Sequence, residues 1–229
     1  MLQFQRLFPL IISIGFLRAS KKVISENIKQ AGSYPVMTLE HKLKGNWSIW
    51  GETEWRAADI LKDFYYYEIK AGMHYKLKKN ITLSAALGIY NTFEEGIRYD
   101  YASRKTEWRL WQQLNVKQNT SVIFPEHRIR IEEVITDNWK LNIRYRLQLK
   151  TPLNKATLTE NAVYLSVYDE IFLRPENQLI RRNRFFGGLG WVVSESVTLQ
   201  TGLLRQVDYR KNADDKGKNF LYLSTSLKL

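Results

Sequence analysis

The residues that could carry chemistry in this chain of 229 residues are three histidines and a large set of arginines and glutamates. The histidines are His41, His74 and His127, and no two of them have the spacing of paired metal ligands. Neither H-x-S nor G-x-S-x-G occurs, so no local motif of a lipase or acyltransferase is present. We therefore expect no metal, no cofactor and no enzymatic activity. A catalytic triad assembled from distant strands is the alternative that the sequence leaves open.

Charged residues of both signs recur at alternate positions in several stretches of the second half of the chain. In a closed interior they could pair across neighbouring strands. The sequence contains no recognised nucleic-acid-binding module, so we expect no nucleic-acid partner and favour internal pairing, with Asp169 as a further acidic partner. The candidate charge network consists of Glu107, Arg109, Arg128, Arg130, Glu132, Arg144, Arg146, Glu170 and Arg184.

The composition excludes several classes of protein. The absence of cysteine rules out a disulfide scaffold, a thiolate zinc site and a cysteine nucleophile. A mean hydropathy of −0.39 and the lack of an 18-residue apolar run rule out a bundle of membrane-spanning helices. Lysine and arginine number 35 against 23 acidic residues, which gives a net charge of +12. This charge calls for an acidic partner, internal counter-charges or solvent.

The elements that must position the charged residues show the period of a β-strand. From Trp139 to Lys150, apolar and polar residues alternate without a break, with Ile143 on one face and Arg144 on the other. A helical period would scatter these charges around the helix, so the pattern excludes a helix. About eleven such strands are recognisable, most of them long enough for the 9–11 or so residues that a tilted strand needs to cross a bilayer.

The connections between these strands alternate in length, as in outer-membrane barrels. Tight links occupy residues 44–46, 78–80 and 194–196, and longer polar links occupy 94–105, 174–181 and 208–218. Two links depart from this rule: residues 136–138 are short on the long side, and 151–161 are long on the short side. No repeat or interdomain linker appears, so we expect one domain over residues 21–229.

Two features favour a membrane barrel over a soluble, lipocalin-like binding barrel with an apolar interior. One is the pairing of charges on the polar faces. The other is a set of aromatic residues near the strand ends on the apolar faces, as in the aromatic girdles at membrane interfaces. These residues are Trp47, Trp55, Tyr65, Tyr75, Trp108 and Trp139. The final strand, which ends on its apolar face at Leu229, agrees with this interpretation.

The beginning of the chain predicts export and bears on the number of strands. Residues 1–20 contain Arg6 and the apolar run Leu7–Leu17, which has the length found in signal peptides and is too short to span a bilayer. Barrels made of one chain normally have an even number of strands. We therefore predict a barrel of 10–12 antiparallel strands and favour twelve, with residues 22–32 supplying an additional first strand.

Several motifs follow one another in the order found in a known family. They are the segments Glu107–Gln113, His127–Glu132, Arg144–Leu147, Thr151–Asn154, Tyr168–Leu173 and Asn183–Gly190. Over about residues 34–229 the chain resembles the uncharacterised outer-membrane family filed as domain of unknown function 2490. The resemblance implies an exported outer-membrane barrel, and it implies no reaction, substrate or catalytic residue.

The sequence thus predicts an all-β, outer-membrane protein of a Gram-negative bacterium that is a structural or accessory component of the envelope. The expected partners are outer-membrane lipid and other envelope proteins in a complex. A narrow pore for small anionic solutes is the first alternative, and a soluble lipocalin-like binding barrel is the second. Because acidic and basic residues share the polar faces, we expect mutual neutralisation and little conductance.

Overall fold

The computed structural model describes residues 31–94, 104–118, 122–136, 138–176 and 179–229, and all regular structure within them is β-strand. No helix in these ranges is long and apolar enough to cross a membrane. The strands are β1 Ala31–Lys42, β2 Trp47–Asp59, β3 Lys62–Lys78, β4 Ile81–Thr92, β5 Lys105–Lys117, β6 Phe124–Ile135, β7 Lys140–Pro152, β8 Val163–Leu173, β9 Ile180–Val192, β10 Val197–Asp208 and β11 Lys216–Lys228.

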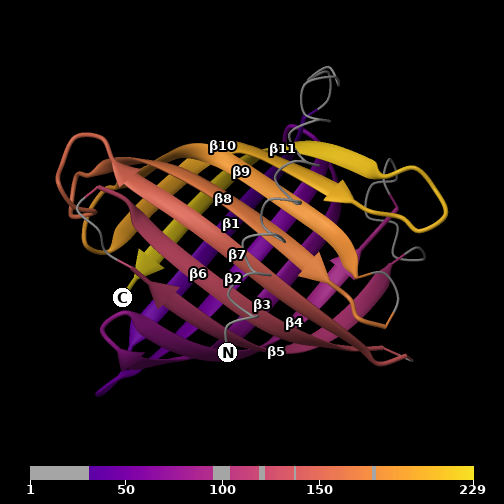
Figure 1. The fold of residues 1–229 in the computed structure, drawn as a ribbon, viewed down its shortest axis with the longest axis horizontal. Coiled ribbons are helices and arrows are strands. Elements are labelled where there is room, and N and C mark those ends of the chain that lie inside the picture. The colour runs from indigo at the N-terminus through magenta and orange to yellow at the C-terminus, as the bar shows by residue number, and fades with distance from the viewer. Residues whose placement is uncertain (1–30, 95–103, 119–121, 137, 177–178) are drawn as a thin grey trace, which may run out of the picture.

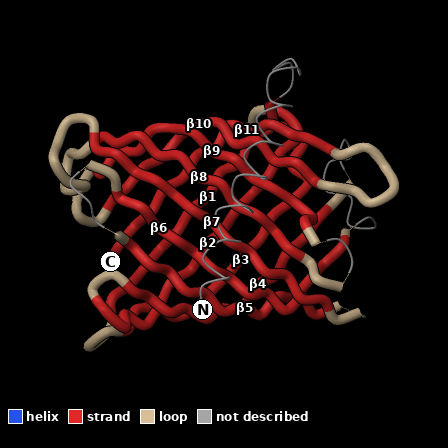
Figure 2. The backbone as a smooth tube through the Cα atoms, viewed as in Figure 1, coloured by secondary structure: helices blue, strands red, loops and turns tan. Residues whose placement is uncertain are grey.

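These eleven strands form one closed barrel in chain order (Figures 1 and 2). Every consecutive pair is antiparallel, whereas β1 and β11 pair in parallel, with Thr38 opposite Ser226. The preference for twelve strands is therefore wrong. Eleven strands of alternating direction bring the first and last into the same direction, so a parallel pair closes the barrel. Of the segment expected to form an additional strand, Ala31 and Gly32 belong to β1, and residues 22–30 lie outside the described residues, as do residues 1–20.

The connections follow the expected alternation in length, with one exception that the sequence did not predict. Tight links join β1 to β2, β3 to β4 and β9 to β10 at one end of the barrel, which we call the short-turn end, and the opposite end is the long-loop end. At the long-loop end, Ile60 and Leu61 alone join β2 to β3. Leu61 adopts a positive φ of 56°. The connecting residues Ile60 and Leu61 are not turn-forming types, and of the residues that usually form turns the run Ala57–Phe64 contains only Asp59 and Asp63.

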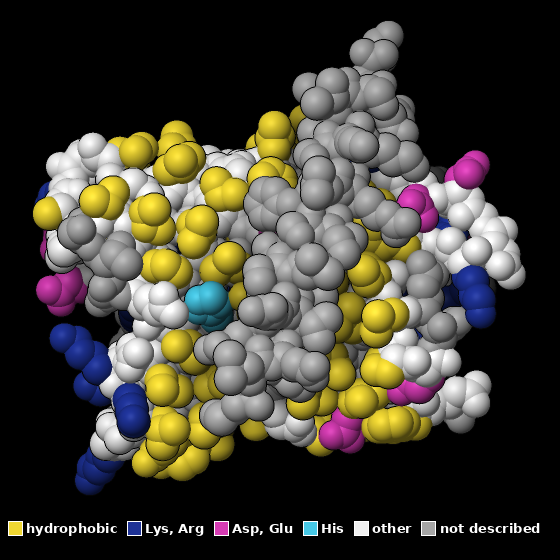
Figure 3. All heavy atoms as spheres, viewed as in Figure 1, with side chains coloured by type: hydrophobic (Ala, Val, Ile, Leu, Met, Phe, Trp, Pro, Cys, Tyr) yellow, Lys and Arg dark blue, Asp and Glu magenta, His cyan; other side chains and the backbone are white. Residues whose placement is uncertain are grey.

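Apolar side chains point outward on every strand, and polar side chains point into the barrel. Arg144 is buried inside and Ile131 is 40% exposed outside. Figure 3 shows apolar side chains spread over the outer surface of the described strands. The outward set includes Leu39, Ile49, Ile69, Leu87, Leu110, Ile131, Leu149, Leu165, Leu189, Leu203 and Leu223, one from each strand. The predicted facing is therefore confirmed.

Two aromatic clusters fill part of the interior. Trp111 is fully buried and lies 5.3 Å from Trp50, ring centre to ring centre. On the other side of the barrel, Phe186 stacks on Tyr168 at 5.0 Å within a larger apolar cluster. Glycines on β9 make room for such rings, because a Cβ at Gly190 would overlap the Tyr164 ring. The small residues of this strand thus accommodate bulky neighbours.

Asp169 departs from the facing rule that its charge suggested. Its neighbours Tyr168 and Glu170 line the interior, so Asp169 points outward and accepts a hydrogen bond of 2.6 Å from Asn183 of β9. It lies with apolar outer residues such as Leu147 and Ile171. The interpretation of Asp169 as an internal partner of the arginines is therefore wrong, since the period of two along β8 places it on the opposite face.

The parallel closure predicts a specific cross-link in this cysteine-free chain. Thr38→Cys combined with Ser226→Cys should form a disulfide on mild oxidation, because these residues are directly opposite each other in β1 and β11. The control, Thr38→Cys with Ser224→Cys, is offset by two residues and should cross-link poorly, because disulfides need Cα atoms within about 4.4–6.8 Å. Non-reducing gel mobility measures the outcome. Cross-linking of the offset pair alone, or of neither pair, would contradict the closing register.

Candidate functional site: a basic chamber inside the barrel

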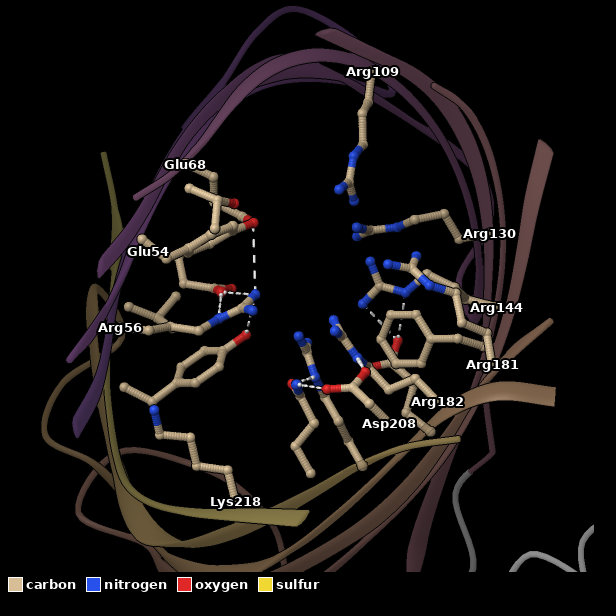
Figure 4. Close-up of a pocket in the computed structure, with 18 of the residues that line it drawn as sticks. Glu54, Arg56, Glu68, Arg109, Arg130, Arg144, Arg181, Arg182, Asp208 and Lys218 are labelled. Carbon is tan, nitrogen blue, oxygen red and sulfur yellow. Dashed lines mark hydrogen bonds and ion pairs between the residues drawn. The ribbon is translucent and has the colours of Figure 1, made fainter. Parts of the chain in front are cut away.

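The half of the barrel nearest the long-loop end contains a cavity of about 360 Å³, which we call the chamber (Figure 4). Its rim includes Lys105, Arg181 and Asp208, which lie at the strand ends nearest the long loops. Its deeper part includes Arg128 and Tyr168, which lie nearer the middle of their strands. Among the described residues, thirteen basic and six acidic side chains line the chamber, an excess of seven positive charges in this lining.

Arg144, Glu132 and Glu170 form the centre of the predicted charge network. Arg144 of β7 donates to Glu132 of β6 at 2.5 Å and to Glu170 of β8 at 2.8 Å. Arg128 reaches the same Glu170 oxygen at 2.5 Å. All three strands are neighbours in the barrel, so the alternation along each one is enough to bring these side chains together. Because the two carboxylates are almost fully buried, these pairs are strongly interdependent.

Two further arginines extend this network to β5. Arg109 lies 3.5 Å from Glu132 and donates to Glu107 at 2.5 Å. Arg130 lies 3.6 Å from Glu132, and its guanidinium stands 3.9 Å from the centre of the Trp111 ring. Cation–π contact of this kind is favourable where water is excluded. Seven of the nine predicted network residues are thus joined by ion pairs.

The remaining two predicted residues make other contacts. Arg146 lies 3.7 Å from Glu126, a residue that was not included in the predicted network. Arg184 donates to the neutral side chain of Gln206 at 3.0 Å, and no acidic side chain in the described ranges lies within ion-pair distance of it. Arg146 therefore pairs with an acidic residue outside the predicted network, whereas Arg184 has no ion pair among the described residues.

A second charge cluster on β2 and β3 was not part of the predicted network. Arg56 donates to Glu54 at 2.5 Å, and Lys70 binds Glu52 at 2.5 Å and also Glu68. The alternation along both strands already placed these residues on polar faces, so pairing across neighbouring strands could have identified them. The three carboxylates lie within 4.8 Å of one another, as the ligands of a cation would. Because Arg56 and Lys70 occupy them, the cluster is explained by internal charge pairing.

Pairing does not neutralise the chamber. Arg181 lines it near the long loops, and like Arg184 it has no acidic partner among the described residues. Figure 4 shows Arg109, Arg130 and Arg181 directed into the same space. Ion pairs thus join most of the residues of the predicted network, and the described lining of the chamber still holds more basic than acidic side chains.

Below the chamber the interior is packed with side chains. Trp50 stacks on His74 at 5.2 Å, and Gln148 donates to Ser166 at 2.9 Å. Ser48, Gln148 and Ser166 are all buried, although they lie in the half of the barrel nearest the short-turn end. None of these residues lines the chamber. The aromatic clusters therefore border the chamber on its inner side, and buried side chains such as Gln148 and Ser166 narrow the interior beneath it.

One pair below the chamber has the residue types of a nucleophile and its base. His74 Nδ1 lies 2.7 Å from Ser84 Oγ, which is hydrogen-bonding distance. Ser84 is buried and does not line the chamber. A serine nucleophile needs a substrate path and a group that orients the histidine. Among the described residues, no carboxylate lies within hydrogen-bonding distance of His74.

Comparison with known proteins identifies a family. The profile of the family described as protein of unknown function (DUF2490) matches residues 31–217, which include most of the barrel, and the chain belongs to this family. No curated protein matches the chain. No solved structure matches it either.

The shared carboxylates predict unequal effects of two conservative substitutions. Glu170→Gln should lower the free energy of unfolding by about 3–5 kcal/mol, because it leaves Arg128 and Arg144 buried without their common counter-charge. Glu107→Gln should cost about 1 kcal/mol or less, since its side chain is 34% exposed and pairs with Arg109 alone. Denaturant unfolding of the detergent-folded protein measures both values. Equal losses would contradict the assignment of Glu170 as a shared partner.

Proposed function

We propose that this member of the DUF2490 family is an outer-membrane β-barrel of a Gram-negative bacterium, without enzymatic activity, that serves the envelope as a closed structural or accessory component. The observation that carries the proposal is the continuous set of exposed apolar side chains on all eleven strands. Water-soluble monomers rarely expose apolar patches larger than a few hundred Å². A hydrocarbon surrounding is the environment in which such an outer surface is stable.

The dimensions and ends of the barrel support the same location. The strands contain 11 to 17 residues, and about 9–11 residues suffice for a tilted strand to cross a bilayer. Trp47 packs against Tyr75 at 4.7 Å near the short-turn end, and Trp108 and Trp139 are exposed at the long-loop end. Aromatic side chains at both ends of the apolar zone are typical of membrane interfaces.

The charged interior argues against the soluble alternative. A lipocalin-like barrel holds its ligand against inward-facing apolar side chains and presents polar side chains to water. Here Glu132, Arg144 and Glu170 are buried inside, and the apolar faces are exposed. The lipocalin-like function is therefore not proposed.

The packed interior favours a closed barrel over a pore. Trp50 and Trp111 lie on one side of the interior and the Tyr168 cluster on the other, and several side chains nearer the short-turn end, among them Gln148 and Ser166, are buried. A narrow anion pore is the second candidate, and the seven excess positive charges of the chamber favour it. We place the closed barrel first because conduction requires a continuous path through the barrel.

A single outward position tests the proposed membrane location. Ile131→Arg should destabilise the barrel in lipid by about 2–4 kcal/mol, because arginine would then face hydrocarbon near the middle of a strand. Ile131→Ala, the control at the same position, removes apolar surface without adding charge and should cost less. Reversible unfolding in liposomes measures both. If the arginine variant is as stable as the alanine variant, Ile131 faces water and the proposal fails.

Electrical recordings test whether the barrel is closed to the passage of ions. Purified protein in planar bilayers should give no stable single-channel steps, because the aromatic clusters and buried side chains narrow the interior beneath the chamber. Trp111→Ala, which removes a fully buried ring from this packing, is the matched variant and should raise the frequency of brief openings. Steady anion-selective steps from the unmodified protein would favour the pore instead.

A further inference from the structure

We propose that the chamber is a binding site for a compact anion that carries two or more phosphate groups and enters from the long-loop end. The inference deepens the proposed function, on which it rests, because it states what a closed barrel would hold. Its first support is charge. Thirteen basic and six acidic side chains of the described residues line one small cavity, and basic side chains remain in excess although Glu126 and Glu132 behind the lining also pair with its arginines. An anion bound there would remove mutual repulsion among the arginines.

The distribution of the unpaired charge locates the site within the chamber. Arg181 and Lys105 come from β9 and β5, line the chamber at the long-loop end and have no acidic partner among the described residues. Arg184 lies deeper, is almost fully buried and donates to the neutral Gln206, and among the described residues no acidic side chain lies within ion-pair distance of it. An anion could therefore meet unpaired cations at the rim and again farther inside.

The type of cation points to phosphate. Arg109, Arg130, Arg144, Arg181 and Arg182 reach into the chamber from different walls (Figure 4). Guanidinium groups bind phosphate and carboxylate oxygens through two parallel hydrogen bonds, which gives geometric selectivity as well as charge. A phosphate group provides oxygens in three directions, so several arginines around one space suit it better than a planar carboxylate.

The size of the chamber limits the ligand. Small-molecule pockets measure about 300–1,000 Å³, and the chamber, at about 360 Å³, lies near the lower limit. One compact polyanion fits such a space. The packed aromatic residues below it, including Trp111, leave no room for a polymer to pass through the barrel. We therefore infer binding without passage.

The experiment uses the full chain folded in neutral detergent and titrated calorimetrically with sodium tripolyphosphate. The unmodified protein should bind one tripolyphosphate. The double variant Arg181→Gln/Lys105→Gln should weaken binding at least tenfold, while its fold is retained, because both residues lie at the rim without ion-pair partners. The matched control Lys211→Gln/Lys155→Gln removes the same charge from exposed residues outside the chamber and should leave the affinity unchanged.

Three results would overturn the inference: no binding, equal weakening by the control variant, or citrate binding as tight as that of tripolyphosphate. Equal weakening would show that total charge alone attracts the anion, and equal citrate binding would show that the chamber does not select phosphate. The test is distinguishable from that of the proposed function. Tripolyphosphate binding together with steady channel steps would support the binding site and contradict the closed barrel. The absence of channel steps together with the absence of tripolyphosphate binding would support the closed barrel and contradict the binding site.

Discussion

Charge buried inside a small closed barrel must be paired, and the rest of this structure depends on that constraint. An unpaired buried charge costs several kcal/mol, so the carboxylates Glu132 and Glu170 are stable only because arginines from neighbouring strands reach them. The pairing in turn requires these strands to keep their order and register, since a slip by one residue would turn the charges outward. The charge network therefore helps to fix the order and register of the strands and also occupies part of the interior.

The same constraint explains the division of the interior into two halves. Nearer the short-turn end, hydrogen-bonding side chains such as Gln148 and the ion pair of Lys150 with Glu126 occupy the interior. Near the long-loop end, basic residues exceed acidic ones, and a chamber is left open. An anion bound there, as proposed above, would offset the excess of positive charge. The proposed anion site is thus the part of the interior where pairing is incomplete.

The period of two along the strands was sufficient to predict the facing of Ile143 and Arg144 and most of the charge network. The same period places Asp169 on the outer face of the barrel. The prediction that Asp169 lies inside followed from its charge alone and disregarded its position along the strand. Other features lie beyond a local pattern. The turn at Ile60 and Leu61 has no turn-forming residue, and the parallel pairing of β1 with β11 depends on the total number of strands. The charge excess of the chamber depends on which side chains share one cavity.

The central claim is that the barrel is turned inside out relative to a soluble protein, with lipid outside and charge inside. Spin labels attached to single cysteines along β7 test it most directly, since the chain has no native cysteine. In liposomes, labels at Ile143 and Leu149 should be accessible to oxygen dissolved in lipid, and labels at Asn142 and Gln148 should be shielded from it. Labels at Ile143 and Leu149 that respond instead to a water-soluble nickel reagent would contradict the account.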